Sequence, residues 1–509
     1  MKMRNLFWAL AALAIVGCQK TDEVAEFAPQ TGGDQSYVAI NIKANDNVTR
    51  LAGAEYEDGT VDEQAVVNAA FYFFNNAGNP FNVNANGNYI NVTIADNGAT
   101  QAPNIESMTD PVLVVEKYKG EFPSKIVAVL NHTATANSSM ADLTATLNGA
   151  GHTAGKNFVM SNSVYMDATG AIIDATPLTI DNFQTSVEKA VANPVTIYVE
   201  RMTAKVSVNG GDSAFNTGIK VNEKEVYAKV MGWDLVGNQL NSYFVKSISA
   251  SWTDDELGFV WNDPAYRRSY WTAKSVAGTV SNAFTYSSLT NNNATVEYVG
   301  EQVGAANTDR TKYIVAAQLQ NVDGNAMEVA QWYGTYYVEE DNLLAAVAPT
   351  LKSKLMQKVG DTYTAIDDSQ LQCVAGAAGI ESYEVAFQLA DGVETNNWYS
   401  FDGAAYTAVA DPNAVLAAIE PAKIWKSGMT YYYADVKHLG DEGKTGEFGI
   451  VRNHAYKVTV TGVKGLGTPV YDPEQRVEDP EKPSDKETYI SAQINVLSWR
   501  LVKQNVTLQ

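Results

Sequence analysis

Short strand-like segments dominate the hydrophobic pattern of this chain. They are rich in β-branched and aromatic residues and are bounded by clusters of Gly, Asn, Asp and Pro, as expected of β-strands that turns connect. The clearest of them cover residues 112–115, 125–130, 195–199, 225–230, 313–319 and 456–460. Helical patterns are few, and we expect short helices only after Ser139, to residue 147, and after Asp341, to residue 348. The sequence therefore predicts an all-β protein made of β-sandwiches with a few short helices.

A regular alternation marks a strand near the N-terminus, in residues 36–44. Val38, Ile40 and Ile42 alternate with smaller or polar residues, which predicts a half-buried strand. Arg50 follows in a stretch of small and polar residues that leads into an acidic segment. A basic residue in such a flexible segment suits a trypsin-like protease, and any surface arginine has the same property.

The C-terminal residues also have a strong strand pattern, with a change of phase inside it. Apolar residues occupy every second position from 490 to 496, and then Leu497, Trp499 and Leu501 take the other parity. Because a shift of one residue requires a bulge or a break, we expect two strands, at about 488–496 and 499–508. Either this hairpin completes its own sheet, or the last strand is given to a sheet of another molecule that lacks one strand.

The domain limits are indicated by composition. A change from a first to a second domain is expected near residue 205, between two extended runs. The segment 465–486 carries four prolines among acidic residues and predicts an extended, solvated linker.

The first eighteen residues have the layout of a bacterial lipoprotein signal. Lys2 and Arg4 are followed by an apolar stretch to residue 16 that is too short to span a bilayer as a helix. Gly17 then precedes Cys18, whose thiol would be acylated as the chain is cut before it. The alternative is an ordinary signal peptide with an incidental cysteine.

Charge and motif content exclude several functions. The net charge of −22 argues against binding to nucleic acid or to anionic lipid surfaces. Cys373 is the only cysteine besides Cys18, and we interpret it as a small buried residue rather than a reactive thiol. The four histidines have no metal-ligand spacing, and the acidic segment 55–63 is interpreted as a solvated turn rather than a calcium site. The sequence predicts no enzyme, no cofactor and no metal.

Exposed aromatic residues offer a second interpretation, a surface lipoprotein that binds glycans. Its candidate stacking residues are Trp332, Tyr333, Tyr336 and Tyr337, or the three tyrosines at 431–433. Alternation within these runs more simply places every second aromatic in the core.

Several of these features together resemble the fimbrillins, the stalk subunits of type V pili, and most closely those of the short (minor) fimbria. The carrying residues are Cys18, Arg50, Trp499, Phe-Val-Met-Ser-Asn-Ser at 158–163, Tyr-Tyr-Tyr-Ala-Asp-Val at 431–436, Gly-Ile-Val-Arg-Asn-His-Ala-Tyr at 449–456 and Gly-Leu-Gly-Thr-Pro at 465–469. The resemblance spans the whole chain, and its C-terminal block is specific. The linker is shorter than the Asp-Pro-rich repeats of some members, and the middle of the chain matches in strand pattern alone.

The resemblance implies a fold and a route of assembly. The fold would be two tandem transthyretin-like β-sandwich domains, 51–205 and 206–509, after a signal peptide 1–17 and a propeptide 18–50. The precursor, lipidated at Cys18, would reach the outer membrane and the cell surface, where a trypsin-like protease would cut between Arg50 and Leu51. The strand of Val38, Ile40 and Ile42 would leave, and the C-terminal strand of another subunit, residues 498–509, would fill the groove. The donor side chains would be Trp499, Leu501, Val502, Val506 and Leu508.

The resemblance further implies a filament made of copies of this chain, with accessory anchor and tip subunits, that supports adhesion and biofilm formation. The alternatives are that the chain is itself an anchor or tip subunit, or the glycan-binding lipoprotein described above. The well-formed terminal strand favours the stalk.

Overall fold

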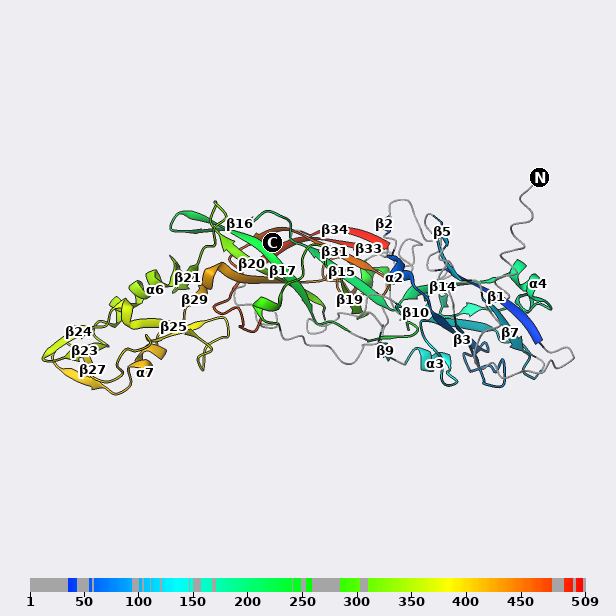
Figure 1. The fold of residues 1–509 in the computed structure, drawn as a ribbon, viewed down its shortest axis with the longest axis horizontal. Coiled ribbons are helices and arrows are strands. Elements are labelled where there is room, and N and C mark those ends of the chain that lie inside the picture. Colours follow the sequence, from blue (N-terminus) through cyan, green and yellow to red (C-terminus); the bar gives the residue numbers. More distant parts are fainter. Residues whose placement is uncertain are drawn as a thin grey trace.

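The computed structural model describes the chain in separate stretches: residues 35–43, 55–56, 59–93, 100–102, 105–109, 111–119, 121–145, 147–149, 157–166, 171–239, 241–248, 253–258, 284–302, 310–477, 489–497 and 500–506. Cys18, Arg50, Leu51, Trp499 and Leu508 lie outside the described residues. The molecule is elongated, with the N-terminal strands at one end, the C-terminal strands in the middle and residues coloured yellow at the other end (Figure 1).

The N-terminal part is built on one ten-stranded sheet, in which two short strands lie off the main path. Along the path the strands are β4 (Tyr89–Thr93), β3 (Asn68–Phe74), β8 (Lys125–Leu130), β10 (Met160–Asn162), β14 (Val195–Arg201), β1 (Gln35–Lys43), β6 (Ile105–Thr109) and β5 (Thr100–Ala102). Off the path, β13 (Thr176–Pro177) pairs with β8, and β7 (Val112–Glu116) pairs with β1.

This sheet curls on itself around one hydrophobic core. Side chains from strands far apart on the path, such as Phe71 of β3 and Ile40 of β1, belong to the same buried cluster. Tyr72 and Phe74 of β3 point to a second cluster on the other face. Both faces of β3 are therefore covered, and its sequence, Asn-Ala-Ala-Phe-Tyr-Phe-Phe, is accordingly apolar at almost every position.

The chain leaves this sheet at Met202, between β14 and β15 (Thr203–Asn209), and enters a two-sheet sandwich. The first sheet has six strands: β19 (Glu297–Gly300), β15, β31 (Ala455–Lys464), β33 (Tyr489–Leu497), β34 (Arg500–Val506) and β2 (Glu55–Tyr56). The second sheet has five strands: β16 (Phe215–Val221), β17 (Lys224–Val236), β20 (Lys312–Gln320), β30 (Met429–Asp435) and β32 (Thr468–Pro469).

The two sheets of the sandwich enclose a single core. Val206 and Val458 from the six-stranded sheet and Trp233 and Tyr313 from the five-stranded sheet are at most 1% exposed and belong to one cluster. Alternate residues of these strands point inward, as in other sandwiches.

A third, separate core lies in residues 321–425, which are inserted between β20 and β30 and form the far end of the molecule (Figure 1). We call this insertion the distal module. Its strands are β21 (Val329–Trp332), β22 (Thr335–Val338), β23 (Met356–Val359), β24 (Thr362–Ala365), β25 (Leu371–Ala375), β26 (Val385–Leu389), β27 (Trp398–Phe401), β28 (Tyr406–Val409) and β29 (Lys423–Trp425). Its helices are α6 (Glu340–Val347) and α7 (Pro412–Ala417). The sequence patterns did not indicate this third core.

Short helices and isolated strand pairs complete the described fold. They are α2 (Val61–Gln64), α3 (Met140–Leu143), α4 (Val187–Ala192) and α5 (Asp254–Leu257), with the pairs β9 (Leu147–Gly149)–β18 (Asn241–Tyr243) and β11 (Tyr165–Met166)–β12 (Ile172–Ile173). Ser139 caps α3 as expected, because its hydroxyl accepts from the Asp142 N–H, but the helix ends four residues before residue 147. The helix expected after Asp341 is α6, but it begins at Glu340, so Asp341 lies in its first turn and does not cap it. Glu339 at the N-cap position makes no capping bond, and the N–H of Glu340 donates to Glu328 instead.

The prediction of an all-β protein with a few short helices is confirmed. Each of the six strand segments named from the pattern lies within a strand of the structure, and residues 125–130 are β8 to the residue. In the part of the chain that the structure describes, no helix has the length and apolar character needed to cross a membrane.

We expect the core of the distal module to respond to loss of packing as other cores do. Leu343 on α6 is fully buried in this core. Leu343→Ala should lower the free energy of unfolding by about 2–5 kcal/mol, since it removes buried methyl groups and leaves a cavity. Chemical denaturation would measure this, with exposed Lys352→Ala as the control. A loss of less than about 0.5 kcal/mol, the range of surface changes, would contradict a packed core at this position.

Candidate functional site

The N-terminal strand β1 lies in the interior of its sheet. On one side it pairs in parallel with β14, with Ile40 opposite Val195. On the other side it pairs antiparallel with β7 along its first half, with Val38 opposite Leu113, and with β6 at its end. The backbone groups of β1 therefore bond strands on both sides, and its neighbours depend on it for theirs.

The side chains of β1 are buried on one face and partly buried on the other, where Tyr37 and Asn41 are of intermediate exposure. Val38, Ile40 and Ile42 are 0% exposed and lie in the core of the N-terminal sheet. Ala39, on the opposite face, is only 3% exposed, and helix α4 contacts β1. The expected strand is thus present, but it is more deeply buried than the half-buried strand that its alternation predicts.

A loop on the same sheet adds further bonds to β1. The N–H of Tyr37 donates to the carbonyl of Gln184 at 2.8 Å, and the N–H of Gln184 donates back to Tyr37 at 2.9 Å. The N–H of Ile40 donates to the carbonyl of Pro111 at 2.8 Å. The strand is held along its length by backbone bonds that do not depend on its side chains.

One polar group on β1 is left unsatisfied. The side-chain oxygen Oδ1 of Asn41 is buried and has no hydrogen-bond partner within the described residues. A buried acceptor without a donor costs about 1–3 kcal/mol. Asn41 therefore weakens the hold of the sheet on β1.

At the other end of the chain, β33 and β34 form a hairpin in the six-stranded sheet. β33 pairs antiparallel with β31, and β34 pairs antiparallel with β33, with Val496 opposite Val502 and Ala492 opposite Val506. The expected phase change separates the two strands, since β33 ends at Leu497 and β34 begins at Arg500. In this conformation the hairpin completes the sheet of its own chain.

The outer side of β34 is only partly paired. Its neighbour there, β2, is two residues long, with Glu55 opposite Leu501 and Tyr56 opposite Arg500. Along the rest of β34 no strand pairs with this outer side among the described residues. The strand that carries the expected donor residues Leu501, Val502 and Val506 therefore has a full neighbour on one side only.

Buried charges join the N-terminal sheet to the sandwich directly after β2. Glu63 of α2 accepts from the Lys205 ammonium at 3.2 Å and from the Tyr298 hydroxyl at 2.8 Å. The guanidinium of Arg201 donates to the backbone carbonyl of Glu63 at 2.8 Å and to Asn453 at 3.2 Å. Burial opposes ionisation of Glu63, but Lys205 and these hydrogen bonds outweigh it and lower the pKa of the carboxyl below its usual value.

A second buried charge cluster lies at the same junction. The guanidinium of Arg452, 0% exposed, bonds the Glu301 carboxylate at 2.8 Å and donates to the carbonyl of Tyr243 at 2.7 Å. Glu200 of β14 bonds the ammonium of Lys246 at 2.9 Å. The Arg452 block that carries the fimbrillin resemblance is thus internal. Its partners Glu301 and Tyr243 follow residue 205 in the chain, and among the described residues its guanidinium reaches the N-terminal sheet only at Glu200 of β14, 4.0 Å away.

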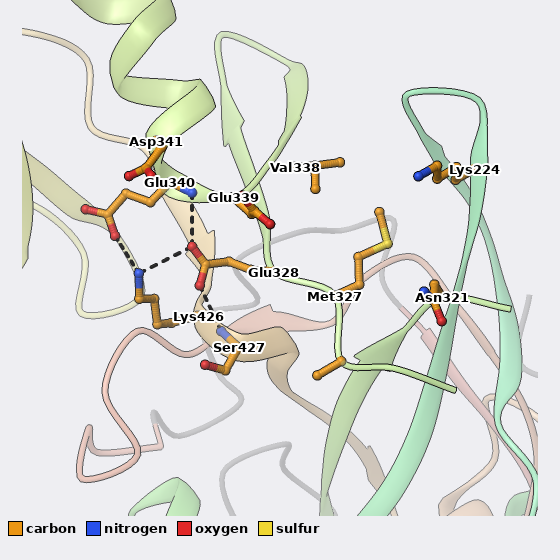
Figure 2. A pocket seen from close by; sticks show the side chains of 11 residues that line it. Lys224, Asn321, Met327, Glu328, Val338, Glu339, Glu340, Asp341, Lys426 and Ser427 are labelled. Carbon is orange, nitrogen blue, oxygen red and sulfur yellow. Dashed lines mark hydrogen bonds and ion pairs between the residues drawn. The ribbon is translucent and has the colours of Figure 1, made fainter. Parts of the chain in front are cut away.

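A third group of charges attaches the distal module to the sandwich (Figure 2). Lys426, just before β30, bonds Glu340 of α6 at 2.9 Å and Glu328, just before β21, at 3.3 Å. The N–H of Ser427 also donates to Glu328. These residues line an open pocket of about 560 Å³. Two of its carboxylates, Glu328 and Glu340, already bond Lys426, and no group of three or more metal-ligating residues occurs in the described stretches.

Cys373 lies on β25 in the core of the distal module and is 5% exposed. Burial, and the nearby Glu340 carboxylate, raise the pKa of its thiol far above the usual value. The thiol is therefore protonated at neutral pH and acts as a small apolar side chain, as expected.

Most of the candidate aromatic residues are part of cores. Trp332, Tyr431 and Tyr432 are buried. The expectation that only every second aromatic is buried is wrong for Tyr431 and Tyr432, because β30 packs on both faces and the two side chains belong to different clusters. Tyr333 is different, because it is 72% exposed at the turn between β21 and β22.

The C-terminal part of the chain matches a known family. Residues 423–505, which run from β29 into β34, match the family model described as "Major fimbrial subunit protein type IV, Fimbrillin, C-terminal". This region is therefore similar to the C-terminal part of major fimbrial subunits, a structural class of protein. The resemblance to the fimbrillins is confirmed in this region, which includes the hairpin and the Arg452 block.

Several solved structures that are described as fimbrial or cell adhesion proteins align with most of this chain. They include a fimbrilin from Porphyromonas gingivalis, at 14% identity over 94% of this chain and 99% of that one, with a TM-score of 0.34. The tip fimbrial protein Mfa3 from the same organism is 11% identical over 90% and 99%, with a TM-score of 0.33. A candidate cell adhesion protein from Parabacteroides distasonis is 13% identical over 93% and 98%, with a TM-score of 0.42. These superpositions are loose, so the assignment rests on the family model. No curated protein matches the chain.

We expect the Glu63–Lys205 pair to contribute to stability in a pH-dependent way. Glu63→Gln leaves the Lys205 ammonium buried without its carboxylate and should cost about 3–5 kcal/mol at neutral pH. The pKa of Glu63 is lowered from 4.5 in the folded state. Its contribution is therefore full above about 4.5 and is lost as the pH falls through the folded pKa.

Denaturant unfolding at several pH values would measure this effect. The gap between wild type and Glu63→Gln should narrow as the pH falls below about 4.5. Glu442→Gln, at an exposed position, should behave as wild type throughout. A gap that stays constant with pH would show that the charge of Glu63 is not what stabilises the junction.

Proposed function

We propose that this chain is the stalk subunit of a cell-surface pilus of type V and that it polymerises by exchange of strands. The precursor is exported as a lipoprotein acylated at Cys18 and held at the outer membrane. A trypsin-like protease cuts between Arg50 and Leu51, and residues 18–50 leave with β1. The C-terminal strand of a neighbouring subunit then fills the vacant place, and repetition of this step builds the filament.

The observation that carries this proposal is the place of β1. It is an interior strand, and Val38, Ile40 and Ile42 are fully buried. Its removal would expose a core groove and leave the inner edges of β14 and β7 without partners. Such an open edge over an apolar core accepts a strand of another chain readily.

The incomplete pairing of β34 supports it as the donor. In its own subunit β34 has β33 on one side and only the two residues of β2 on the other. In the vacated groove it would have a neighbour on each side. It would also bury several apolar side chains, each worth about 1.5–3 kcal/mol. The donor residues are Trp499, Leu501, Val502, Val506 and Leu508.

The contacts of α2 support cleavage at Arg50 without loss of the domain. Glu63 holds the segment after the cleavage point to Lys205 and Tyr298 of the sandwich. The chain after Leu51 therefore has its own anchor. A cut between Arg50 and Leu51 breaks its covalent link to β1, which is then held by hydrogen bonds and packing alone.

Assembly would place this chain in a filament of its own copies, with accessory anchor and tip subunits at the ends, where it supports adhesion and biofilm formation. An anchor or tip subunit remains the alternative within the same class. A strand-like C-terminal hairpin with an incompletely paired outer strand favours the stalk, since a tip subunit need not donate a strand. We retain the mature domains as 51–205 and 206–509.

Removal of the cleavage site should abolish polymerisation. Arg50→Ala should give lipidated, monomeric protein, because the trypsin-like protease has no basic residue to recognise there. Thr49→Ala, which keeps Arg50, should form filaments like wild type. Filaments sheared from cells would be compared on an unboiled denaturing gel, and their N-terminus should be Leu51. Filaments of the Arg50→Ala protein that still carry residues 18–50 would overturn the proposal.

Loss of packing on β1 should affect the precursor and spare the filament. Ile40→Ala should lower the free energy of unfolding of the uncleaved protein by about 2–5 kcal/mol. Cleaved filaments should dissociate at the wild-type temperature, because β1 is absent from them. Ile197→Ala, in the neighbouring strand that stays, should weaken both forms. Ile40→Ala filaments that dissociate earlier than wild type would show that β1 remains in the polymer.

A further inference from the structure

We propose that the distal module carries a binding pocket for an acidic sugar residue, with Tyr333 as its stacking platform. The pocket has a volume of about 560 Å³. It lies where the β21–β22 turn, the segment after α6 and helix α7 meet. The residues that determine its chemistry are Trp332, Tyr333, Thr350, Lys354, Val415 and Ile419.

The backbone at Tyr333 has an unusual conformation. Tyr333 and Gly334 form the two-residue turn between β21 and β22, with φ of +47° and +75°. This is the turn that favours Asn-Gly, since both residues have positive φ. A tyrosine in this conformation is strained, and strain of this kind is concentrated at functional sites.

The side chain of Tyr333 is exposed and packs on one neighbour, Trp332. Tyr333 is 72% exposed, so packing in the core offsets little of the strain of its positive φ. Its ring packs on the indole of Trp332, with 4.8 Å between centroids. Trp332 is itself fixed, because its Nε1–H donates to the carbonyl of Glu420 at 2.9 Å. The tyrosine ring is thus in contact with a fixed indole, with 56° between the two ring planes.

The pocket has an apolar side and a polar side. Val415 and Ile419, on and just after α7, give it an aliphatic wall. Thr350 donates its hydroxyl proton to the carbonyl of Val347 at 2.7 Å, so its oxygen is left to accept. A pyranose has the matching surface, because one face of the ring carries C–H groups and its rim carries hydroxyls. Pockets for small ligands have this composition of apolar walls and a few placed polar groups.

The pocket carries a positive charge. Lys354 is the only charged residue among those that line the pocket. In the distal module lysines are rare and acidic residues frequent, yet three of its lysines, Lys352, Lys354 and Lys358, lie close together in sequence. An ammonium group at the pocket favours a ligand with a carboxylate, because charge-assisted hydrogen bonds are the stronger ones. The geometry therefore points to a glycan that contains an acidic sugar, rather than to a neutral one.

This pocket does not depend on strand exchange, so the unassembled protein should bind. We would titrate the purified full chain with two matched pairs of probes and detect binding by saturation-transfer NMR and calorimetry. The pairs are 3′-sialyllactose with lactose, and methyl β-D-glucuronide with methyl β-D-glucoside. At least one acidic probe should bind about tenfold more tightly than its neutral partner. No binding of either acidic probe, or no preference over the neutral partners, would overturn the proposal.

Variants of the pocket test the roles of its residues. Tyr333→Asn should reduce the affinity for the acidic probe about tenfold or more, and it should raise the melting temperature, because asparagine tolerates positive φ. Lys354→Gln should bring the affinity down to that of the neutral probe. Tyr406→Ala, an exposed tyrosine on β28 elsewhere in the module, should bind as wild type. If Tyr333→Asn binds as wild type, or if it lowers the melting temperature, Tyr333 supports the fold and not a ligand.

Discussion

The N-terminal domain depends on one constraint: a strand inside a sheet must have its backbone groups paired on both sides. β1 joins β14, which leads to β10, β8, β3 and β4, with β6 and β7 on its other side. Without a strand in this place the sheet would fall into two parts, and the core that they share would open. The place can be vacated only if another strand occupies it, which makes the sheet a receptor for a strand of matching pattern.

A second constraint fixes how the two domains sit on each other. Charges buried at their junction are stable only with their partners, since an unpaired buried charge is strongly destabilising. Lys246 with Glu200 of β14, and Lys205 of β15 with Glu63 of α2, each require one relative position of the chain segments that carry them. In a filament built as we propose, the groove and the donor hairpin of each subunit would therefore keep a constant relative orientation.

Local patterns were sufficient for part of this structure, and distant partners determined the rest. Alternation predicted β1 and the break between β33 and β34, because a period of two follows from the pleat of a strand. It could not predict that Ile40 lies inside a sheet, since that depends on pairing with Val195 far along the chain. For the same reason the sequence did not show that Arg452 pairs with Glu301, 151 residues earlier in the chain. Tyr333 was among the candidate aromatic residues, but alternation could not show that it is exposed, because the turn at this residue interrupts the strand pattern.

The attachment of the distal module has a consequence for how such proteins can diverge. β20 and β30, between which the module is inserted, are direct antiparallel neighbours, with Gln318 opposite Met429. The two ends of the insertion therefore leave the sandwich side by side, and a short turn could replace everything between them. The entropic cost of closing a loop between two neighbouring ends grows only slowly with the length of the loop. Segments of very different length can therefore be exchanged here without disturbing the sheet. The outer end of this molecule is thus a part that can be exchanged without altering the sandwich, so its surface properties can change while the rest of the architecture persists.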